Sequence, residues 1–365
     1  MTVMVAGKRH TSKLRVRPVP WPHAGFNAEL LRLFLLDPHV HRPFSATGVS
    51  KEDLAACRVA SLGETRGTLL VAEAGARAEG LLFMEPEIWG SAYLDQRIWS
   101  VRHLLVAPDA PARTAEILVD TALRILDDPV DLLVAQVPAT DGAVLRGLHR
   151  GGFRVVGCEA VGVVDSPGDN GYYPPGVSIA PLRREHLPDA AVIAKNCCTF
   201  NGYTPDAGFD SSRLERLYGH LLGLRVDDPD SGALVAEEDA GAVLGFAGYR
   251  LETELESYTP LRLAGLDLLG VRPDRQSNGL GEILHRQALS RLKAERVQAV
   301  TTRITASRPA RWNSPAILRR IGYRIASSNL ILHRRPGRDR FSQLAIGLFE
   351  DSNEGSPDRR AGRTA

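Results

Sequence analysis

The hydrophobic and polar positions of the chain follow two periods, and the same order of periods occurs twice. In the first half, apolar stripes that repeat every 3.6 residues predict helices over 26–36, 50–59, 113–126 and 143–150. Short apolar runs predict strands over 68–72, 80–85, 98–106 and 132–137, with a last strand that ends at 164. Strands that alternate with helices in this way predict an α/β fold.

The second half repeats this order after a segment dense in Pro, Gly, Asp and Asn. Its pattern predicts helices over 187–199, 211–224, 280–295 and 314–321, and strands over 177–182, 233–238, 242–251, 266–271, 297–304 and 325–332. Val-x-Pro at 106–108 recurs at 271–273, and Gly-Phe at 152–153 recurs as Gly-Tyr at 322–323. The sequence therefore indicates two copies of one domain.

The length of 365 residues agrees with two domains. We expect a flexible basic arm over 1–20, a first domain over 21–165, a linker over 166–176, a second domain over 177–336, and a mostly disordered tail over 337–365 that is rich in charge, Gly and Ser.

One stretch of the second copy predicts a phosphate-binding turn. The buried run Leu266–Val271 ends at Pro273, and Gln276–Gly281 then leads directly into a helical pattern. Glycines let the backbone approach a ligand closely, and the first N–H groups of a helix point towards such a turn. The positive end of the helix dipole lies there too, so an anion binds without a lysine.

The spacing decides which phosphate ligand the turn suits. No Gly-Lys-Ser/Thr follows, and the third glycine of a dinucleotide fingerprint is replaced by Leu284. What remains is Gln/Arg-x-x-Gly-x-Gly/Ala after Val-x-Pro, with Val271, Pro273, Gln276, Gly279 and Gly281 in register. This pattern resembles the pyrophosphate loop of the GCN5-related N-acetyltransferases (GNAT); the alternative is an ordinary glycine-rich connection between a strand and a helix.

The resemblance implies two tandem GNAT-like domains, each a mixed central sheet flanked by helices, and acetyl-CoA or a longer acyl-CoA as cosubstrate. In that family the pantetheine arm inserts between the central strand and the next strand. The residues that this implies for the cofactor are Leu269, Gly270, Val271, Gln276, Ser277, Asn278, Gly279, Leu280 and Gly281.

The first copy departs from the pattern at each key position. Pro111, Thr114 and Glu116 stand where the second copy has Gln276, Gly279 and Gly281. Proline has no N–H to donate, a threonine side chain hinders close approach, and the glutamate places negative charge where a pyrophosphate would lie. We therefore expect a degenerate first copy that binds no CoA.

Tandem chains with an inactive first half resemble the enzymes that acetylate the amine of a sugar nucleotide, such as the dTDP-fucosamine acetyltransferases. Segments 87–93, 135–139 and 200–206 are similar to segments of that family. The resemblance implies that a primary amine, on a free, nucleotide-linked or natural-product amino sugar, attacks the acyl-CoA directly in a ternary complex. The alternatives are an acyl-CoA sensor or scaffold without turnover, and an acetyltransferase for a peptide or protein amine or for a small antibiotic.

Acyl transfer requires a base for the amine and an acid for the leaving thiolate. Asp267 is the candidate base; strand alternation predicts that it shares a face with Leu269 and Val271. Many family members carry a carboxylate two residues earlier, where this chain has Gly265. The alternative is a hydrogen-bonded strand aspartate. The tyrosine that serves as acid in the family is replaced by Leu318.

Further candidates are weaker single residues. Asn313 is either a catalytic asparagine in a shifted position or a helix N-cap, and His220 is either a second base or a packing residue. Acceptor contacts are predicted for four residues, since sugars favour aromatic and carboxylate groups: Tyr203, Asp206, Tyr249 and Glu252.

Composition limits the partners. Forty-five Lys and Arg against 43 Asp and Glu argue against a nucleic-acid partner. The cysteines Cys57, Cys158, Cys197 and Cys198 show no Cys-x-x-Cys spacing, so we predict no metal centre and a reduced, cytoplasmic setting. No apolar stretch reaches about 18 residues, and no secretory signal is recognised, so no membrane partner is expected. An oligomer remains possible.

Overall fold

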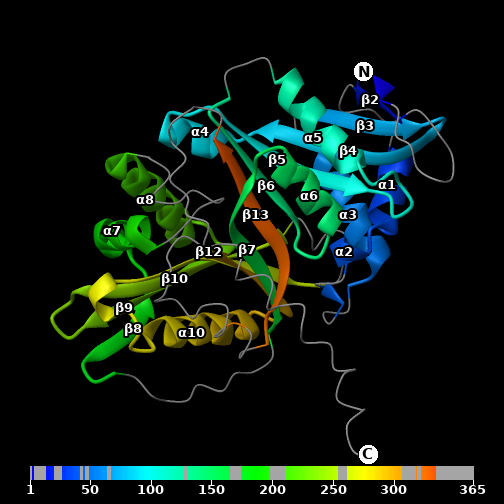
Figure 1. The fold of residues 1–365 in the computed structure, drawn as a ribbon. Helices are drawn as coiled ribbons and strands as arrows, with labels where there is room; N and C mark the ends of the chain where they lie inside the picture. The colour runs from blue at the N-terminus through cyan, green and yellow to red at the C-terminus, as the bar shows by residue number, and fades with distance from the viewer. Residues whose placement is uncertain are drawn as a thin grey trace, which may run out of the picture.

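A computed structural model describes residues 2–3, 14–19, 27–41, 44–45, 49–63, 67–126, 130–164, 174–197, 210–253, 261–305, 318 and 322–333. Within these residues, thirteen strands form one sheet in the order β1-β2-β3-β4-β5-β6-β13-β7-β12-β11-β10-β9-β8. The order is nearly symmetric about its centre, as expected for two copies of one domain joined along a sheet (Figure 1).

The first half contains all four helices predicted for it and two further short ones. Its strands are β1 Thr2–Val3, β2 Leu14–Val19, β3 Thr68–Ala74, β4 Arg77–Pro86, β5 Ile98–Val106, β6 Leu132–Pro138 and β7 Arg154–Val163. Its helices are α1 Asn27–Leu36, α2 Pro38–His41, α3 Lys51–Gly63, α4 Ile88–Leu94, α5 Thr114–Ile125 and α6 Gly142–Arg150. The hydroxyl of Ser50 accepts from the backbone N–H of Asp53 and caps α3, as the sequence predicts.

The second half begins with β8 and ends with β13. Its strands are β8 Val177–Pro181, β9 Ser231–Glu238, β10 Val243–Leu251, β11 Leu263–Val271, β12 Ala299–Thr305 and β13 Arg324–His333. Its helices are α7 Leu187–Cys197, α8 Ser211–Asp227 and α10 Leu280–Ala294, with short 3-10 turns η3 Arg184–His186 and η5 Pro273–Arg275. These bounds agree with the predicted elements to within a few residues, except that the helix predicted over 314–321 lies, apart from Leu318, outside the described residues.

The two halves exchange their last strands at the centre of the sheet. Strand β13 of the second half pairs with β6 of the first half, and β7 of the first half pairs with β12 of the second. The strands β7 and β13 also pair with each other in antiparallel fashion. Neither half therefore completes its sheet alone, and the α/β fold class with tandem mixed sheets is confirmed. The predicted domain boundaries stay a prediction.

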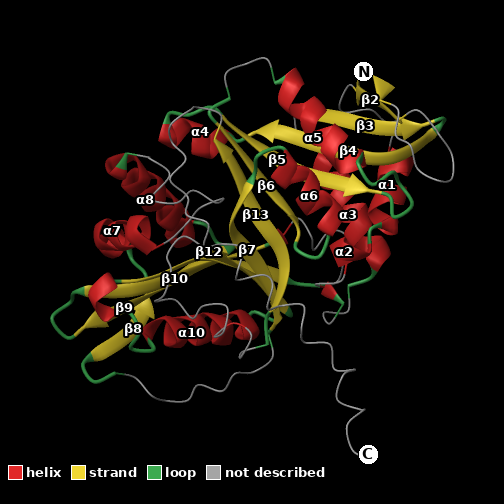
Figure 2. Ribbon diagram, in the orientation of Figure 1, coloured by secondary structure: helices red, strands yellow, loops and turns green. Residues whose placement is uncertain are grey.

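Helices cover both faces of the second half (Figures 1 and 2). Helix α10 packs on one face through buried residues such as Leu284, Ala288 and Leu292. Helices α7 and α8 pack on the opposite face, which we call the α8 face, through residues such as Ile193 and Leu217. Helix α4 of the first half lies on the α8 face together with α7 and α8, and it contacts α8. The first half therefore closes one side of the α8 face.

One prediction about local structure is wrong. Residues 14–19, expected in a flexible arm, form β2, which buries Leu14, Val16 and Val19 beside β3. Over the first three residues of this strand, buried Leu14, exposed Arg15 and buried Val16 alternate. This period of two identifies a half-buried strand. Residues 88–94, for which no helix or strand was predicted, form α4, which the Glu87 side chain caps.

A second correction concerns strand β11. Its register against β10 shifts between the pairs Gly248–Leu268 and Arg250–Gly265, so β11 contains one extra residue there. Such a bulge reverses the alternation of the side chains that follow. Leu269 and Val271 lie on the α10 face, whereas Asp267 contacts α8. The prediction that these three residues share one face is therefore wrong.

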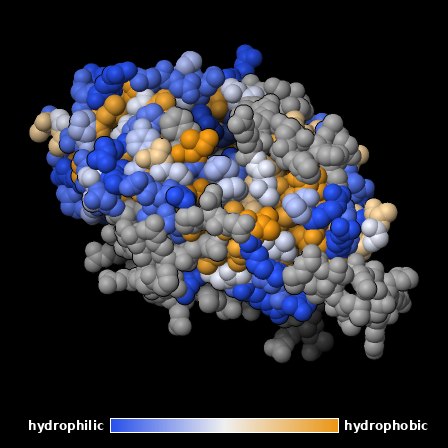
Figure 3. Space-filling view, turned by 90° about the horizontal axis from the view of Figure 1, so that it is seen from above, coloured by the Kyte–Doolittle hydropathy of each residue, from blue (hydrophilic) through white to orange (hydrophobic). Residues whose placement is uncertain are grey.

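Polar and charged side chains cover much of the outer surface, and apolar residues show in scattered groups between the parts drawn in grey (Figure 3). Among the described helices, none is long and apolar enough to cross a membrane. The described cysteines Cys57, Cys158 and Cys197 are thiols rather than disulfides.

A buried polar pair joins α10 to the last strand. His285 Nε2 and the Tyr323 hydroxyl lie 3.0 Å apart, and both side chains are buried. Burial lowers the pKa of His285 to about 4 and raises the pKa of Tyr323, because both charged forms lose water. The imidazole is thus neutral in the folded protein at every pH above about 4.

This pair predicts a pH dependence of stability. As pH falls from about 6.5 to about 4, the unfolded His285 gains a proton that the folded one does not accept. The free energy of unfolding should fall by up to about 3 kcal/mol over that window, and the stabilisation is fully present above it. His285→Gln should weaken this dependence. Urea unfolding at pH 7.5 and 4.5 tests it, and identical pH dependence in both proteins would refute it.

Candidate active site

The central feature of the second half is a split between two parallel strands. Strand β11 pairs with β12 only from Leu263–Ala299 to Leu266–Thr302. Within the described strands, β11 then continues through Asp267–Val271 beside β10, while β12 continues beside β7. The backbone of Asp267–Val271 thus has one edge that none of the described strands covers, and such an edge can pair with an extended ligand.

The predicted turn closes the wide end of this split. The Gln276 amide donates to the Val271 carbonyl at 2.9 Å and contacts Cys197 Sγ at 3.4 Å. Ser277 has a φ of 68° and Gly279 a φ of 79°, and Gly279 is the N-cap of α10. A non-glycine residue in the left-handed region is uncommon and often marks a functional turn. These residues fix the turn directly beside the end of β11.

The end of helix α10 is open towards the turn. A Cβ built on Gly279 meets no atom within 4 Å, and one on Gly281 meets only Val271 Cγ2 at 3.6 Å. No side chain caps the helix at Gly279. Its first N–H groups are therefore directed at space that no described residue fills, which suits an anion of the size of a phosphate.

The same place in the first half is filled. Glu116 accepts from Arg113 at 2.8 Å and pairs with Arg150, so its carboxylate lies at the N-terminal turn of α5. These two arginines lower the pKa of Glu116, which stays charged. Thr114 is fully buried and donates its hydroxyl to Pro111 O. Strands β5 and β6 split like β11 and β12, but the turn beside them carries a carboxylate.

A polar band lies on the α8 face around the split of the second half. Arg225 of α8 donates to Asp267 at 2.9 Å, and the Arg225 side chain is only 6% exposed. On the other side of the split, Arg303 of β12 pairs with Glu159 of β7 at 3.5 Å. Because β7 belongs to the first half of the sequence, both halves contribute charges to this band.

The predicted acceptor residues fall in different places. Glu252 follows β10, within the polar band, with Arg250 as its partner. Tyr249 lies on the opposite face, in the core under α10, where its hydroxyl donates to Glu295 at 3.2 Å. Burial raises the pKa of Tyr249 to about 12. Tyr249 is therefore a packing residue, and its assignment to the acceptor site is wrong.

His220 lies on α8 next to the first half. Its ring stacks on that of Tyr93 from α4, with ring centroids 5.3 Å apart. Asp95, at the end of α4, pairs with Arg213 at the start of α8. These contacts make His220 part of the junction between α4 and α8. Three other candidates, Asn313, Tyr203 and Asp206, lie outside the described residues, as does Cys198.

The sequence pattern did not identify Arg225, Arg303 or Glu159 as site residues. Each is a single charged residue in an otherwise apolar or mixed segment. The charge of Arg225 among the leucines of a buried helix face was a usable signal, because a buried arginine requires a carboxylate. The pair of Arg303 with Glu159 depends on the exchanged strand β7, for which the sequence carries no signal.

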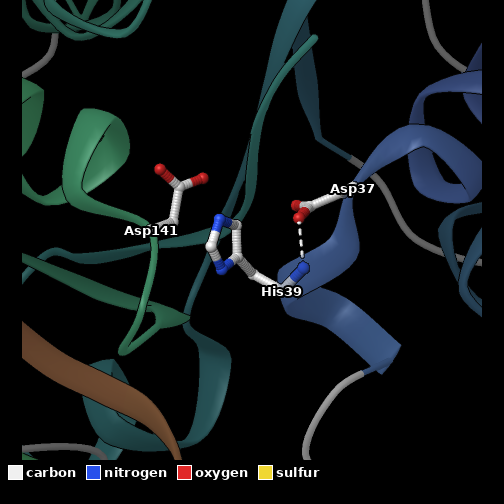
Figure 4. Close-up of side chains that lie close together, drawn as sticks. All are labelled: Asp37, His39 and Asp141. Atoms are coloured by element: carbon white, nitrogen blue, oxygen red, sulfur yellow. Dashed lines mark hydrogen bonds between the residues drawn. The ribbon is translucent and has the colours of Figure 1, made fainter. Parts of the chain in front are cut away.

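A second cluster of polar side chains lies in the first half. Figure 4 shows the ring of His39 between the carboxylates of Asp37 and Asp141, and one ligand atom of each lies within 4.8 Å of the others. Both carboxylates have structural roles. Asp37 accepts from the backbone N–H of His39, and Asp141 accepts from those of Ala143 and Val144 at the start of α6. The cluster is explained by helix capping, and we assign no metal to it.

An uncovered strand edge that leads to an open helix N-terminus has the shape to hold an extended ligand with a phosphate group at one end. Residues 197–313, which contain the split and the turn, match the model of the acetyltransferase (GNAT) family. No curated protein matches the sequence.

Solved structures share the fold over nearly the whole chain. A GCN5-related N-acetyltransferase from Sphaerobacter thermophilus has 17% identity and a TM-score of 0.58, with 89% of this chain and 96% of that chain covered. A tandem GNAT protein from the clavulanic acid biosynthesis pathway has 17% identity and a TM-score of 0.52, with 88% and 99% covered. At these identities the likeness establishes the tandem GNAT fold.

Proposed function

We propose that the second half of this chain is an acyl-CoA-dependent N-acyltransferase, most simply an N-acetyltransferase, and that its acceptor is the primary amine of an amino sugar. The observation that carries the proposal is the continuity between the split and the open turn. The pyrophosphate of CoA would bind the N–H groups at Ser277–Gly281, and the pantetheine arm would pair with the uncovered edge of Asp267–Val271.

The polar band supports a polar acceptor. Its carboxylates at Glu159, Glu252 and Asp267 suit an ammonium group, and its arginines suit hydroxyl or phosphate oxygens. A sugar amine, free, nucleotide-linked or on a natural product, offers both kinds of group. A glucosamine N-acetyltransferase region of a fungal multi-domain β-N-acetylglucosaminidase has the same fold at 14% identity and a TM-score of 0.53, with 90% of this chain and 39% of that chain covered.

The proposed reaction is a direct attack in a ternary complex. The neutral amine attacks the thioester carbonyl, a C–N bond forms, and the C–S bond breaks to release the CoA thiol. Cys197 lies beside the turn, where its thiol contacts the Val271 carbonyl at 3.1 Å. The sequence around this cysteine carries no paired histidine motif, so we propose no acyl-cysteine intermediate.

A thiol-release assay with acetyl-CoA tests the proposal. We expect release that depends on amine acceptors and is fastest for one amino sugar in a panel that also contains peptide amines and aminoglycoside antibiotics. If thiol release is fastest with a peptide or antibiotic amine, the acceptor is not an amino sugar, but the reaction is still an N-acyl transfer.

The second candidate function is an acyl-CoA sensor without turnover. One observation favours it: the residue at the position of the family's acid is Leu318, which is buried in the core with α10. A thermal shift with acetyl-CoA combined with no thiol release for any amine would support the sensor and refute the transferase.

The contrast between the two turns predicts one CoA site per chain. Isothermal titration with acetyl-CoA should give a stoichiometry near one, because Glu116 and its arginines fill the turn of the first half. A stoichiometry near two would show that the first half also binds the cosubstrate.

A further inference from the structure

Glu252 has a position that the sequence did not indicate. It follows the last residue of β10, and its backbone N–H donates to the Leu263 carbonyl of β11 at 2.9 Å. Gly248, which lies four residues before Glu252 on β10, faces Arg225 of α8. Because alternate residues of a strand share a face, Arg250 and Glu252 also lie on the α8 face, which carries the polar band.

The carboxylate of Glu252 fills the space left by a missing side chain. Gly265 of β11 has no side chain, and a Cβ built there would lie 3.1 Å from Glu252 Oε1 and 3.7 Å from Thr301 Oγ1 of β12. The pair Gly265–Thr301 is the second-last pair before the strands separate. The carboxylate therefore lies at the closed end of the split, on the side where α8 and the polar band lie.

That end is where the reacting group would arrive. An extended arm that starts at the turn after Val271 and follows the uncovered edge of β11 ends where β12 closes the split, at Leu266. A carboxylate beside Gly265 is one residue from this point along β11. The acceptor amine must reach the same point from the α8 face, because α10 covers the other face.

The alternative carboxylate, Asp267, is already committed to another charge. Its Oδ2 accepts from Arg225 at 2.9 Å, and this guanidinium is 6% exposed and requires an anion. The pair of Glu252 with Arg250 is looser, with distances of 3.3 and 3.4 Å and an Arg250 side chain that is 51% exposed. An exposed pair of this kind contributes little and rearranges easily.

We infer that Glu252 is the proton acceptor of the reaction and that Asp267 is a structural partner of Arg225. This inference rests on the proposed N-acyltransferase function. The Glu252 carboxylate takes one proton from the acceptor ammonium, directly or through a water molecule, and the neutral amine then attacks the thioester carbon. The C–S bond breaks, the second proton of the nitrogen goes to the CoA thiolate, and Glu252 returns its proton to solvent.

Glu252→Gln tests this assignment, because glutamine keeps the shape and cannot accept the proton. We expect turnover at saturating substrates to fall about a hundredfold or more. Acetyl-CoA affinity should stay within about threefold, since the turn is unchanged. The loss should shrink at high pH, where more of the amine arrives neutral. Glu295→Gln is the matched control, because Glu295 lies on the α10 face beside Tyr249, and its turnover should match the wild type.

A second variant separates chemistry from structure. In Glu252→Ala, which empties that space, the further change Gly265→Asp brings a carboxylate back to it from β11, and part of the lost turnover should return. Near-normal turnover of Glu252→Gln, or a loss independent of pH, would overturn the inference while leaving the transferase function intact. Wild-type protein that binds acetyl-CoA but acetylates no amine would overturn both.

Discussion

Gly279→Glu should abolish binding of acetyl-CoA while the protein still folds. Gly279 is the N-cap of α10, with a φ of 79° and no atom within 4 Å of a built Cβ. The new side chain enters the space proposed for the pyrophosphate and adds a negative charge at the positive end of the helix. The left-handed backbone costs a non-glycine residue about 1–2 kcal/mol, which a chain of this size should tolerate. Isothermal titration measures the loss of affinity.

Gly75→Glu is the control for this variant. Gly75 lies in the turn between β3 and β4, with a φ of 67° and again no atom within 4 Å of a built Cβ. The backbone strain and the added charge are therefore matched, but the site is in the first half. Gly75→Glu should bind acetyl-CoA like the wild type. Equal affinity of Gly279→Glu and Gly75→Glu would show that the turn does not hold the cosubstrate.

Asp267→Asn should lower the free energy of unfolding by about 2–3 kcal/mol, because it leaves the buried guanidinium of Arg225 without its anion. The equivalent change at Glu252 breaks only an exposed pair and should cost no more than about 0.5 kcal/mol. We therefore expect opposite outcomes for the two variants. Asp267→Asn should lose more stability, and Glu252→Gln should lose more turnover. Chemical denaturation of both variants measures the stability difference.

The double variant Asp267→Asn with Arg225→Met checks the physical reason. Once the buried charge is removed, much of the lost stability should return, since replacing both partners of a buried ion pair is often close to neutral. A double variant less stable than Asp267→Asn would contradict the ion-pair explanation. A turnover loss of a hundredfold in folded Asp267→Asn would restore Asp267 as the base.

Local signals in the sequence were sufficient for the turn and for most elements. The spacing from Val271 to Gly281 depends on backbone conformation and on the start of a helix, both set by neighbouring residues. The degenerate turn of the first half could be predicted for the same reason, because Pro111 and Glu116 interact with residues close to them in the sequence. Residues 14–19 were missed because basic residues alternate with apolar ones, and the basic composition of the whole segment obscured the strand.

The assignment of faces failed where the backbone is irregular. A single bulge in β11 separates Asp267 from Leu269 and Val271, and strand alternation alone carries no information about it. The exchange of β7 and β13 likewise depends on long-range pairing. It brings Glu159 to Arg303 across the two halves, so a charge of the apparently inactive half lies in the proposed acceptor site.

A single-turnover experiment with acetyl-CoA labelled in its acetyl group tests the central claim most directly. With an amino-sugar acceptor, mass spectrometry should find one labelled N-acetyl product for each CoA released, and Gly279→Glu should form neither. Without the acceptor, the acetyl-CoA should remain intact and the protein unlabelled. Labelled protein in the absence of an amine, or acetyl-CoA that stays bound and intact with every amine, would contradict direct acyl transfer at this site.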